Sequence, residues 1–347
     1  NEKKILEIAK ATKEIGGEMF VLDDGWFGKR NNDKCSLGDW YINKKKLPSG
    51  IDGLSKKINE MGLKFGLWVE PEMVSPDSDL YRAHPDWAIK TDVYEPSQGR
   101  NQLVLDLTND EVVEYIINTM TDVFRYGNIE YIKWDNNRQM TDVFSHRKDA
   151  RSGEFFHRYM LGLYKVWSAL TEKFPEILFE ACSSGGNRFD LGTFCYMPQC
   201  WTSDNTDALE RVYIQAGTSY GYPQSVMTMH VACSPSFACL RPSSIEHRFN
   251  VAAFGLLGYE LDVTNLSRFD KAAVKKQIEY YKAHRYLLQY GEFDRIGDFF
   301  TDNIAKWQIT SPDKKESILG YFINRVSPNW GNDVIRFTGL DEEKDYE

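Results

Sequence analysis

Two strand-like runs of this chain end in a carboxylate whose neighbours suit catalysis. Residues 131–138 deliver Asp135 between Lys133 and Arg138, and residues 200–207 bring Asp204 into a polar turn just after Trp201. Retaining cleavage of a glycosidic bond needs two carboxylates about 5–5.5 Å apart, one to attack the anomeric carbon and one to protonate the leaving oxygen. Two such strand ends therefore suggest glycoside hydrolysis.

The residues near each carboxylate indicate which catalytic role it takes. Lys133 lies two residues before Asp135, on the same face of a strand, so its ammonium favours the ionised nucleophile. Asp204 is left as acid/base, a role in which burial or repulsion from Asp135 must keep it protonated. The alternative is that Asp135 caps a turn and Asp204 caps a helix. Asp207 lies closer to the helical start at Ala208 and competes for that cap, which leaves Asp204 free for chemistry.

Other polar or aromatic residues follow further strand-like runs. The pair Asp23-Asp24 could accept hydrogen bonds from two sugar hydroxyls, an interpretation we favour over a metal site or a simple Asp-Gly turn. Trp68, near two glutamates, is either a sugar platform or a core residue. Arg100 lies in a loop and would ordinarily be a surface residue. Residues 182–186, Cys-Ser-Ser-Gly-Gly, suit a ligand edge or a flexible turn, and nothing there indicates an activated thiol.

Short β-rich runs alternate with helical stretches, which predicts an α/β fold with a parallel sheet. The predicted strands are residues 18–23, 63–69, 102–107, 130–135, 177–181, 196–201, 226–230 and 259–263, and the clearest helices are 52–61, 110–126 and 154–173. Reactive residues follow nearly every strand and no G-x-G-x-x-G follows the first, so we expect a TIM-type (β/α)8 barrel rather than a Rossmann sheet.

A different pattern begins after residue 290. Alternating runs at 305–310, 317–324 and 334–338, with polar turns at 311–313 and 328–331, predict an antiparallel β domain. We therefore expect a catalytic barrel over residues 1–290 and part of a C-terminal β domain over residues 291–347.

Composition excludes several classes of function. The net charge of -9 over 347 residues argues against a nucleic-acid partner. The six cysteines and six histidines lack zinc spacing, so we expect no metal. No apolar run is long enough to cross a bilayer and no signal-peptide core is present, which predicts no membrane partner and a cytoplasmic protein.

Four motifs together resemble the α-galactosidases of glycoside hydrolase family 36, in clan D. These are Leu-Asp-Asp-Gly-Trp-Phe-Gly at 22–28, Lys-Trp-Asp at 133–135, Cys-Ser at 182–183 and Ser-Asp-Asn-Thr-Asp-Ala at 203–208. The resemblance spans most of the chain. It implies a (β/α)8 barrel, retention of configuration, and hydrolysis of terminal α-galactosides in melibiose, raffinose and stachyose without a cofactor.

The resemblance also assigns roles by motif. It makes Asp135 the nucleophile and Asp204 the acid/base. The remaining matches are substrate-binding positions: Asp23 and Asp24 for O4 and O6 with Trp68 beside them, Arg100 and Lys133 for neighbouring hydroxyls, Asn137 in the same loop, and Cys182, Ser184 and Trp201 on the O2 side.

The chain departs from the family pattern in three ways. We expect an N-terminal β domain and the first barrel strand to be missing ahead of Asn1, so that residues 102–107 form an excursion and seven barrel strands remain. Asn136 stands where the family often has methionine, and Ser184 where it often has glycine. The missing domain commonly contributes to a neighbouring subunit's pocket, which implies a homo-oligomeric full-length protein.

Three other functions remain open. Two belong to the same family: an α-N-acetylgalactosaminidase, which needs more room on the O2 side, and an α-galactosyl transglycosylase. The third is a non-catalytic sugar-binding barrel, which requires Asp135 and Asp204 to be too far apart or misdirected.

Overall fold

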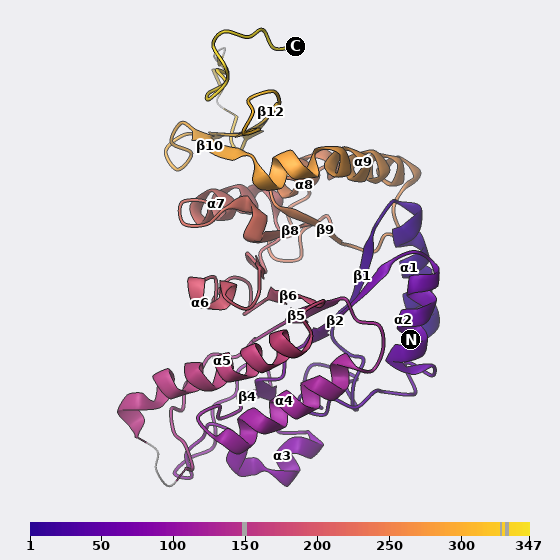
Figure 1. Cartoon of the computed structure of the whole chain (residues 1–347), viewed down its shortest axis with the longest axis vertical. Coiled ribbons are helices and arrows are strands. Elements are labelled where there is room, and N and C mark those ends of the chain that lie inside the picture. The colour runs from indigo at the N-terminus through magenta and orange to yellow at the C-terminus, as the bar shows by residue number, and fades with distance from the viewer. Residues whose placement is uncertain (148–150, 327, 330–332) are drawn as a thin grey trace. The chain divides into compact units, whose positions relative to one another are not determined.

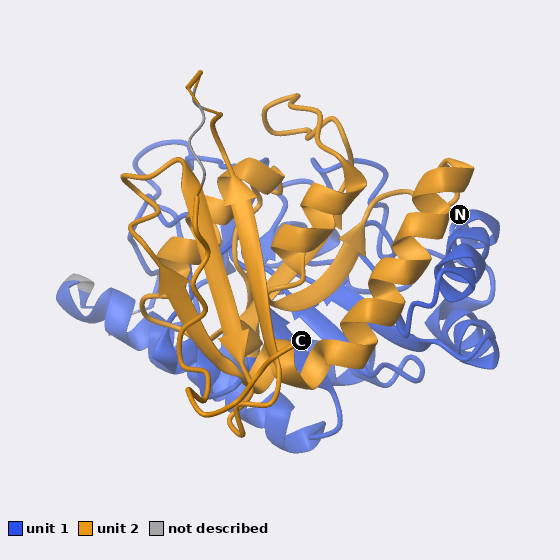
Figure 2. Ribbon diagram, turned by 90° about the horizontal axis from the view of Figure 1, so that it is seen from above, with its two compact units in different colours: residues 1–198 blue, residues 199–347 orange. Residues whose placement is uncertain are grey.

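The computed structural model describes residues 1–147, 151–326, 328–329 and 333–347. These residues form two compact units, residues 1–198 and 199–347 (Figure 2). The division between residues 290 and 291 expected from the sequence stays a prediction.

The first unit contains four parallel strands in the order β1, β2, β5, β6 (Figure 1). They are β1 (Met19–Leu22), β2 (Lys64–Val69), β5 (Tyr131–Trp134) and β6 (Leu178–Ala181). Leu67 pairs with Ile132, which pairs with Phe179, and all three side chains are buried. Because the strands are parallel and in register, the residues that follow them emerge at the same edge of the sheet.

Helices connect these strands as the predicted pattern requires. The longer ones are α1 (Glu2–Glu14), α2 (Gly50–Glu60), α4 (Asp110–Phe124) and α5 (Phe155–Lys173), with α1 packed against α2 and α4 against α5. Short turns of helix are α3 (Asp79–Ala83), α6 (Leu191–Phe194), η1 (Pro85–Trp87) and η2 (Ser152–Glu154). The predicted stop signal after α2 is confirmed, since Gly62 has a φ of 77°, which suits glycine best.

Residues 102–107 do not form a barrel strand. The strand found there is β4 (Leu103–Val104), and it pairs antiparallel with β3 (Met73–Val74) in a separate two-stranded sheet. The pattern-based strand prediction is therefore wrong, and the excursion implied by the family resemblance is what the structure contains. A buried apolar run has the same appearance in sequence whether it joins the main sheet or a small side ribbon.

The second unit continues the strand-helix pattern with three parallel strands. These are β7 (Gln199–Trp201), β8 (Met227–Ala232) and β9 (Leu256–Glu260), with α7 (Ala208–Thr218), η3 (Gln224–Val226), α8 (Ile245–Ala252) and α9 (Arg268–Tyr290). The strand predicted at residues 259–263 begins three residues too late. Glycine within a run normally argues against a strand, but Gly258 is part of β9 and pairs with His230. The His230 ring fills the space where a Cβ on residue 258 would lie.

An antiparallel three-stranded sheet follows, as predicted. It contains β10 (Glu292–Ile296), β11 (Ile304–Thr310) and β12 (Ser317–Ile323). The sequence did not indicate β10, and residues 334–338 form no strand. There, the backbone of Thr338 bonds instead to the side-chain amide of Gln308, whose Nε2 donates at 2.6 Å and whose Oε1 accepts at 2.9 Å. Trp330 and Gly331 of the predicted 328–331 turn lie outside the described residues.

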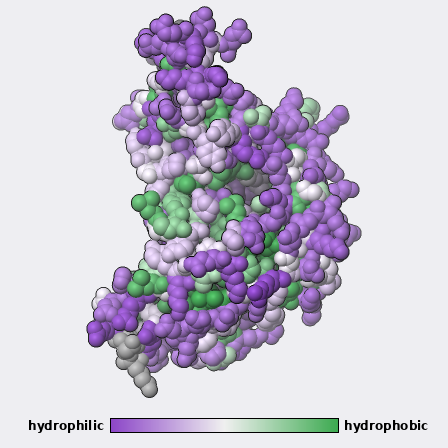
Figure 3. Space-filling view, viewed as in Figure 1, coloured by the Kyte–Doolittle hydropathy of each residue, from purple (hydrophilic) through white to green (hydrophobic). Residues whose placement is uncertain are grey.

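Hydrophilic side chains cover most of the face seen in Figure 3, with hydrophobic residues scattered among them. In the described part of the chain, no helix is both long enough and apolar enough to cross a membrane.

Candidate active site

Asp135 follows directly after β5 and is only 6% exposed. Its Oδ2 accepts hydrogen bonds from Trp68 Nε1 at 3.0 Å and from Asn137 Nδ2 at 2.7 Å, and its Oδ1 accepts one from the Asn136 backbone N–H at 2.8 Å. Three neutral donors therefore hold this carboxylate in one orientation. A carboxylate held in one orientation can be aimed at a single reacting atom, as a nucleophile requires.

The Asn137 amide extends this network to β6. Its Oδ1 accepts a hydrogen bond from Ser184 Oγ at 3.1 Å, while its Nδ2 donates to Asp135. Ser184 has a φ of 44°, a conformation that glycine adopts more readily. A glycine would fit this backbone geometry, but it would lack the contact that the hydroxyl of Ser184 makes.

Lys133 bonds to a different carboxylate from the one the sequence suggested. Its Nζ donates to Asp23 Oδ2 at 3.0 Å. Burial alone would lower the pKa of Lys133, but Asp23 first, and then Cys182, Glu180 and Asp135, hold it well above its ordinary value. The ammonium is thus a permanent positive charge that serves both Asp23 and, less directly, Asp135.

The neighbouring Asp24 is held by a residue that sequence reasoning missed. Arg30, which is 4% exposed, donates from Nε to Asp24 Oδ1 at 3.1 Å and from Nη2 to Oδ2 at 2.8 Å. Asp23 and Asp24 are both exposed. Each of the paired carboxylates therefore has its own cation, and both keep surface free for a ligand.

Cys182 and Arg100 differ in their relation to this network. Cys182 is buried beside Asp135, and burial and that carboxylate raise the pKa of its thiol well above the ordinary value. It is therefore a neutral wall of the site. Arg100 is exposed, with a φ of 52°, and acts on the buried Glu70 through its charge.

Glu72 is fully buried and accepts five hydrogen bonds, one of which comes from Asn136, the residue after Asp135. The donors are Arg188 Nη1 and Nη2 at 2.6 and 2.8 Å, Tyr159 Oη at 2.8 Å, Trp134 Nε1 at 2.9 Å and Asn136 Nδ2 at 3.2 Å. Burial alone would raise the pKa of Glu72, but Arg188 and the other donors hold it below its ordinary value. Asn136 takes part in this network through its amide, a contact unavailable to methionine.

Glu70, two residues earlier, is also buried but has the opposite electrostatics. Its Oε1 accepts the Asn137 backbone N–H at 2.7 Å, and its Oε2 faces Gln102 Nε2 at 3.3 Å. Burial and the charge of Asp135 raise its pKa well above the ordinary value. Sequence reasoning noted the two glutamates beside Trp68 but could not distinguish them.

Asp204 lies in the second unit, after β7, and is exposed. Its Oδ1 accepts a hydrogen bond from Trp201 Nε1 at 2.9 Å. Asp207 is the N-cap of α7 and accepts the Glu210 N–H at 3.1 Å. The prediction that Asp207 takes the capping role is therefore confirmed, and Asp204 is left free of it. The separation of Asp204 from Asp135, in the first unit, stays a prediction.

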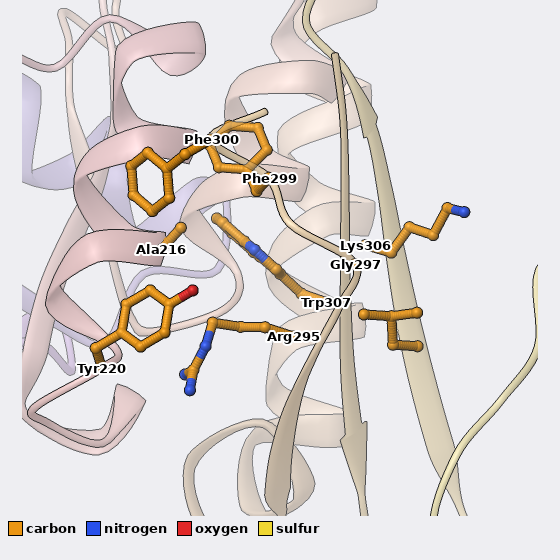
Figure 4. A pocket seen from close by; sticks show the side chains of 9 residues that line it. Ala216, Tyr220, Arg295, Gly297, Phe299, Phe300, Lys306 and Trp307 are labelled. Carbon is orange, nitrogen blue, oxygen red and sulfur yellow. The ribbon is translucent and has the colours of Figure 1, made fainter. Parts of the chain in front are cut away.

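A cavity elsewhere in the second unit has no part in this chemistry. Figure 4 shows the Trp307 indole pointing into it, with Phe299 on one side and Arg295 on the other. The cavity measures about 10 Å³, roughly the space of one water molecule, whereas ligand pockets measure about 300–1,000 Å³. Among the described residues, no group of three or more His, Cys, Asp or Glu side chains could hold a metal ion.

Parallel strands with carboxylates at their ends, followed by an antiparallel sheet, are typical of barrel-type glycoside hydrolases. The chain belongs to the Melibiase family, whose model matches residues 1–291, and residues 304–347 match the glycosyl hydrolase family 36 C-terminal domain. The resemblance inferred from the four motifs is thereby confirmed.

Characterised relatives support this assignment. The chain is 50% identical over 348 residues to alpha-galactosidase AgaA of Geobacillus stearothermophilus, a match covering 100% of this chain and 48% of that protein. It is 48% identical to alpha-galactosidase 1 of Pediococcus pentosaceus, covering 93% of this chain and 44% of that protein. The crystal structure of AgaA matches with a TM-score of 0.96 at 49% identity, covering 99% of this chain and 48% of that one. This match confirms the predicted fold class.

The chain spans about half the length of these relatives. AgaA variants have also been solved in complex with raffinose and with stachyose, and these structures match this chain with the same TM-score of 0.96.

Proposed function

We propose that this chain is the catalytic part of a retaining exo-α-galactosidase that hydrolyses terminal α-galactosyl residues of melibiose and raffinose-family oligosaccharides. Asp135 attacks the anomeric carbon and forms a glycosyl-enzyme, while Asp204 protonates the leaving oxygen and then activates water. The observation that carries the proposal is the Asp135 carboxylate, buried at a strand end and held by three neutral donors. Membership of the Melibiase family supports the sugar assignment.

The surrounding residues suit a galactose ring. Asp23 and Asp24 are exposed carboxylates that can accept hydrogen bonds from hydroxyls at O4 and O6, and Lys133 connects Asp23 to the environment of Asp135. Trp68, Arg100, Asn137, Cys182, Ser184 and Trp201 are the further substrate contacts we propose. We propose that Cys182 and Trp201, each of which is buried, lie on the O2 side and leave little room for an N-acetyl group, so that galactose is favoured over its N-acetylated analogue.

The test is hydrolysis of an activated aryl α-galactoside by the full-length protein, paired with azide rescue of Asp135→Gly. Glycine removes the nucleophile and leaves room for azide, so restored turnover should yield β-galactosyl azide. Asp23→Gly, which removes an exposed carboxylate proposed to bind the sugar, is the matched control, and azide should not rescue it.

Three other results would contradict this proposal, and each would indicate a different function. If the wild-type protein cleaves only the N-acetylgalactosamine glycoside, the proposed specificity for galactose is wrong. Galactosyl transfer to sugar acceptors in excess of hydrolysis would indicate the transglycosylase. A folded wild-type protein that binds galactosides without turnover would indicate a non-catalytic sugar-binding barrel.

Two properties of the whole protein belong to the same proposal. The family resemblance supports a homo-oligomer. A cytoplasmic location is supported by the six cysteines, all of which lie among the described residues and are free thiols.

A further inference from the structure

Arg211 is a buried cation at the start of α7 that the reaction outlined above does not use. It is 3% exposed, and its charge acts on Glu260 and Asp204. Burial, opposed by these two carboxylates, lowers its pKa to about 10, so the guanidinium stays charged at neutral pH. Burying a cation costs stability unless its donors are well used.

Two of those donors bracket Asp204. Arg211 Nη2 donates to the Ser203 carbonyl at 2.6 Å and Nε donates to the Asn205 carbonyl at 2.8 Å. These carbonyls belong to the residues immediately before and after Asp204. One rigid guanidinium therefore fixes the backbone on both sides of the carboxylate, a geometry that the single ammonium of lysine cannot reproduce.

The same guanidinium also touches the side chain that holds the carboxylate. Its central carbon lies 4.4 Å from the centroid of the Trp201 ring, and Trp201 Nε1 donates to Asp204 Oδ1 at 2.9 Å. His230 lies against the same indole, with ring centroids 4.4 Å apart. Arg211 thus acts on Asp204 through the backbone and through Trp201.

We propose that Arg211 is a positioning residue that aims the Asp204 carboxyl at the glycosidic oxygen. The inference rests on the proposed function of Asp204. In the first step, the bond from Asp135 to the anomeric carbon forms as the bond to the leaving oxygen breaks, and the Asp204 proton passes to that oxygen. In the second step, the water oxygen bonds to the anomeric carbon as the bond to Asp135 breaks, and Asp204 takes the proton from that water. A misplaced Asp204 would impair these proton transfers while leaving the attack of Asp135 intact.

The experiment measures how the rate depends on the leaving group. A 2,4-dinitrophenolate departs without protonation, whereas the alcohol of melibiose needs a general acid, which contributes roughly 10²–10⁴-fold. In the full-length protein, Arg211→Gln should lower kcat/KM about 100-fold or more for melibiose and about threefold or less for the dinitrophenyl galactoside. The ratio kcat/KM is used because it reports formation of the glycosyl-enzyme. Arg211→Lys, which keeps the charge and the buried stem, should lie between Arg211→Gln and wild type.

Deglycosylation supplies a second readout. For the dinitrophenyl substrate, kcat of Arg211→Gln should fall and be restored by azide, which needs no general base, giving α-galactosyl azide. Arg241→Gln is the matched control, because Arg241 bonds Asp207 and Glu210 at the same end of α7 but neither of the carbonyls beside Asp204. It should leave the dependence on leaving group unchanged.

Equal losses on both substrates, or no loss on either, would overturn the role of Arg211. Asp204→Ala, measured in parallel, distinguishes a failure of the positioning role of Arg211 from a failure of the catalytic role of Asp204. If Asp204→Ala shows the leaving-group pattern and the Arg211 variants do not, only the positioning role fails. If Asp204→Ala also lacks it, the assignment of Asp204 fails.

Discussion

The two proposed catalytic carboxylates have very different surroundings. Asp135 is 6% exposed and accepts three hydrogen bonds, and two fully buried glutamates accept hydrogen bonds from the two residues that follow it. Asp204 is exposed, and the hydrogen bond its carboxylate accepts in the described structure comes from Trp201. A nucleophile must stay ionised and hold one position, whereas an acid/base must exchange protons with leaving group and water. The contrast fits these two roles.

The two buried glutamates, Glu70 and Glu72, also differ from each other in their electrostatic surroundings. Glu72 has a salt bridge to Arg188 and a pKa below its ordinary value, whereas Glu70 has no cation bonded to it among the described residues and a raised pKa. One buried carboxyl is thus charged, and the other is suited to keeping its proton beside Asp135. Burial and the negative charge of Asp135 thus both oppose ionisation of Glu70.

The largest expected effect comes from Asp135→Asn. The amide keeps the shape but cannot attack, so kcat/KM should fall by about 10⁴-fold or more for every leaving group. Thermal unfolding should stay near that of wild type. Kinetics with melibiose and with the dinitrophenyl galactoside check this, with Asp204→Asn as the comparison. If both variants show the same dependence on leaving group, the assigned division of roles is wrong.

Glu72→Gln should produce the largest loss of stability. It leaves the Arg188 guanidinium buried without a counter-charge, which costs about 3–5 kcal/mol in free energy of unfolding. The pKa of Glu72 lies below its ordinary value of 4.5, so its stabilisation is present above pH 4.5 and is lost as the pH falls through the folded-state pKa.

Urea unfolding across this pH range tests the prediction. The gap between wild type and Glu72→Gln should narrow toward acid pH. The double variant Glu72→Gln/Arg188→Met removes both charges and should recover part of the stability. A gap that is constant from pH 3 to pH 7 would show that the ion pair is not its source.

A smaller effect is expected at the N-cap of α7. Asp207→Ala removes the cap and the partner of Arg241, so we expect a loss of about 1–2 kcal/mol in free energy of unfolding. Asp207→Asn keeps the capping oxygen and should lose less. Chemical denaturation compares the two variants. Equal losses would mean that the charge pairing with Arg241, rather than the cap, dominates.

The smallest effect is expected for Glu70→Gln, which should shift the free energy of unfolding by about 1 kcal/mol or less near pH 4.5. The glutamine keeps an oxygen for the Asn137 N–H and carries no charge. Because the pKa of Glu70 is raised, its contribution to stability is fully present below pH 4.5 and declines as the pH rises toward the folded-state pKa. The variant should therefore gain stability relative to wild type between pH 4.5 and pH 8. A relative loss over that range would show that Glu70 is ionised in the folded protein.

Local features of the fold could be predicted well from the sequence. The helices near residues 52–61, 110–126 and 154–173 and the N-cap at Asp207 depend on neighbours within a few residues, and the structure contains them. The strands expected at 102–107 and 334–338 failed for a different reason. Whether an apolar run joins the main sheet, a side ribbon or no sheet depends on partners distant in the chain.

The sequence by itself determined the family, through four motifs of which three place carboxylates after strands, and with it the residues proposed to do the chemistry. Only the tertiary structure separated Glu70 from Glu72, joined Ser184 to Asp135 through Asn137, and brought Arg211 to the two carbonyls beside Asp204. Residue type and spacing are local properties of the chain. The charge state of a buried group depends on burial and on partners such as Arg188, which is separated from Glu72 by 116 positions.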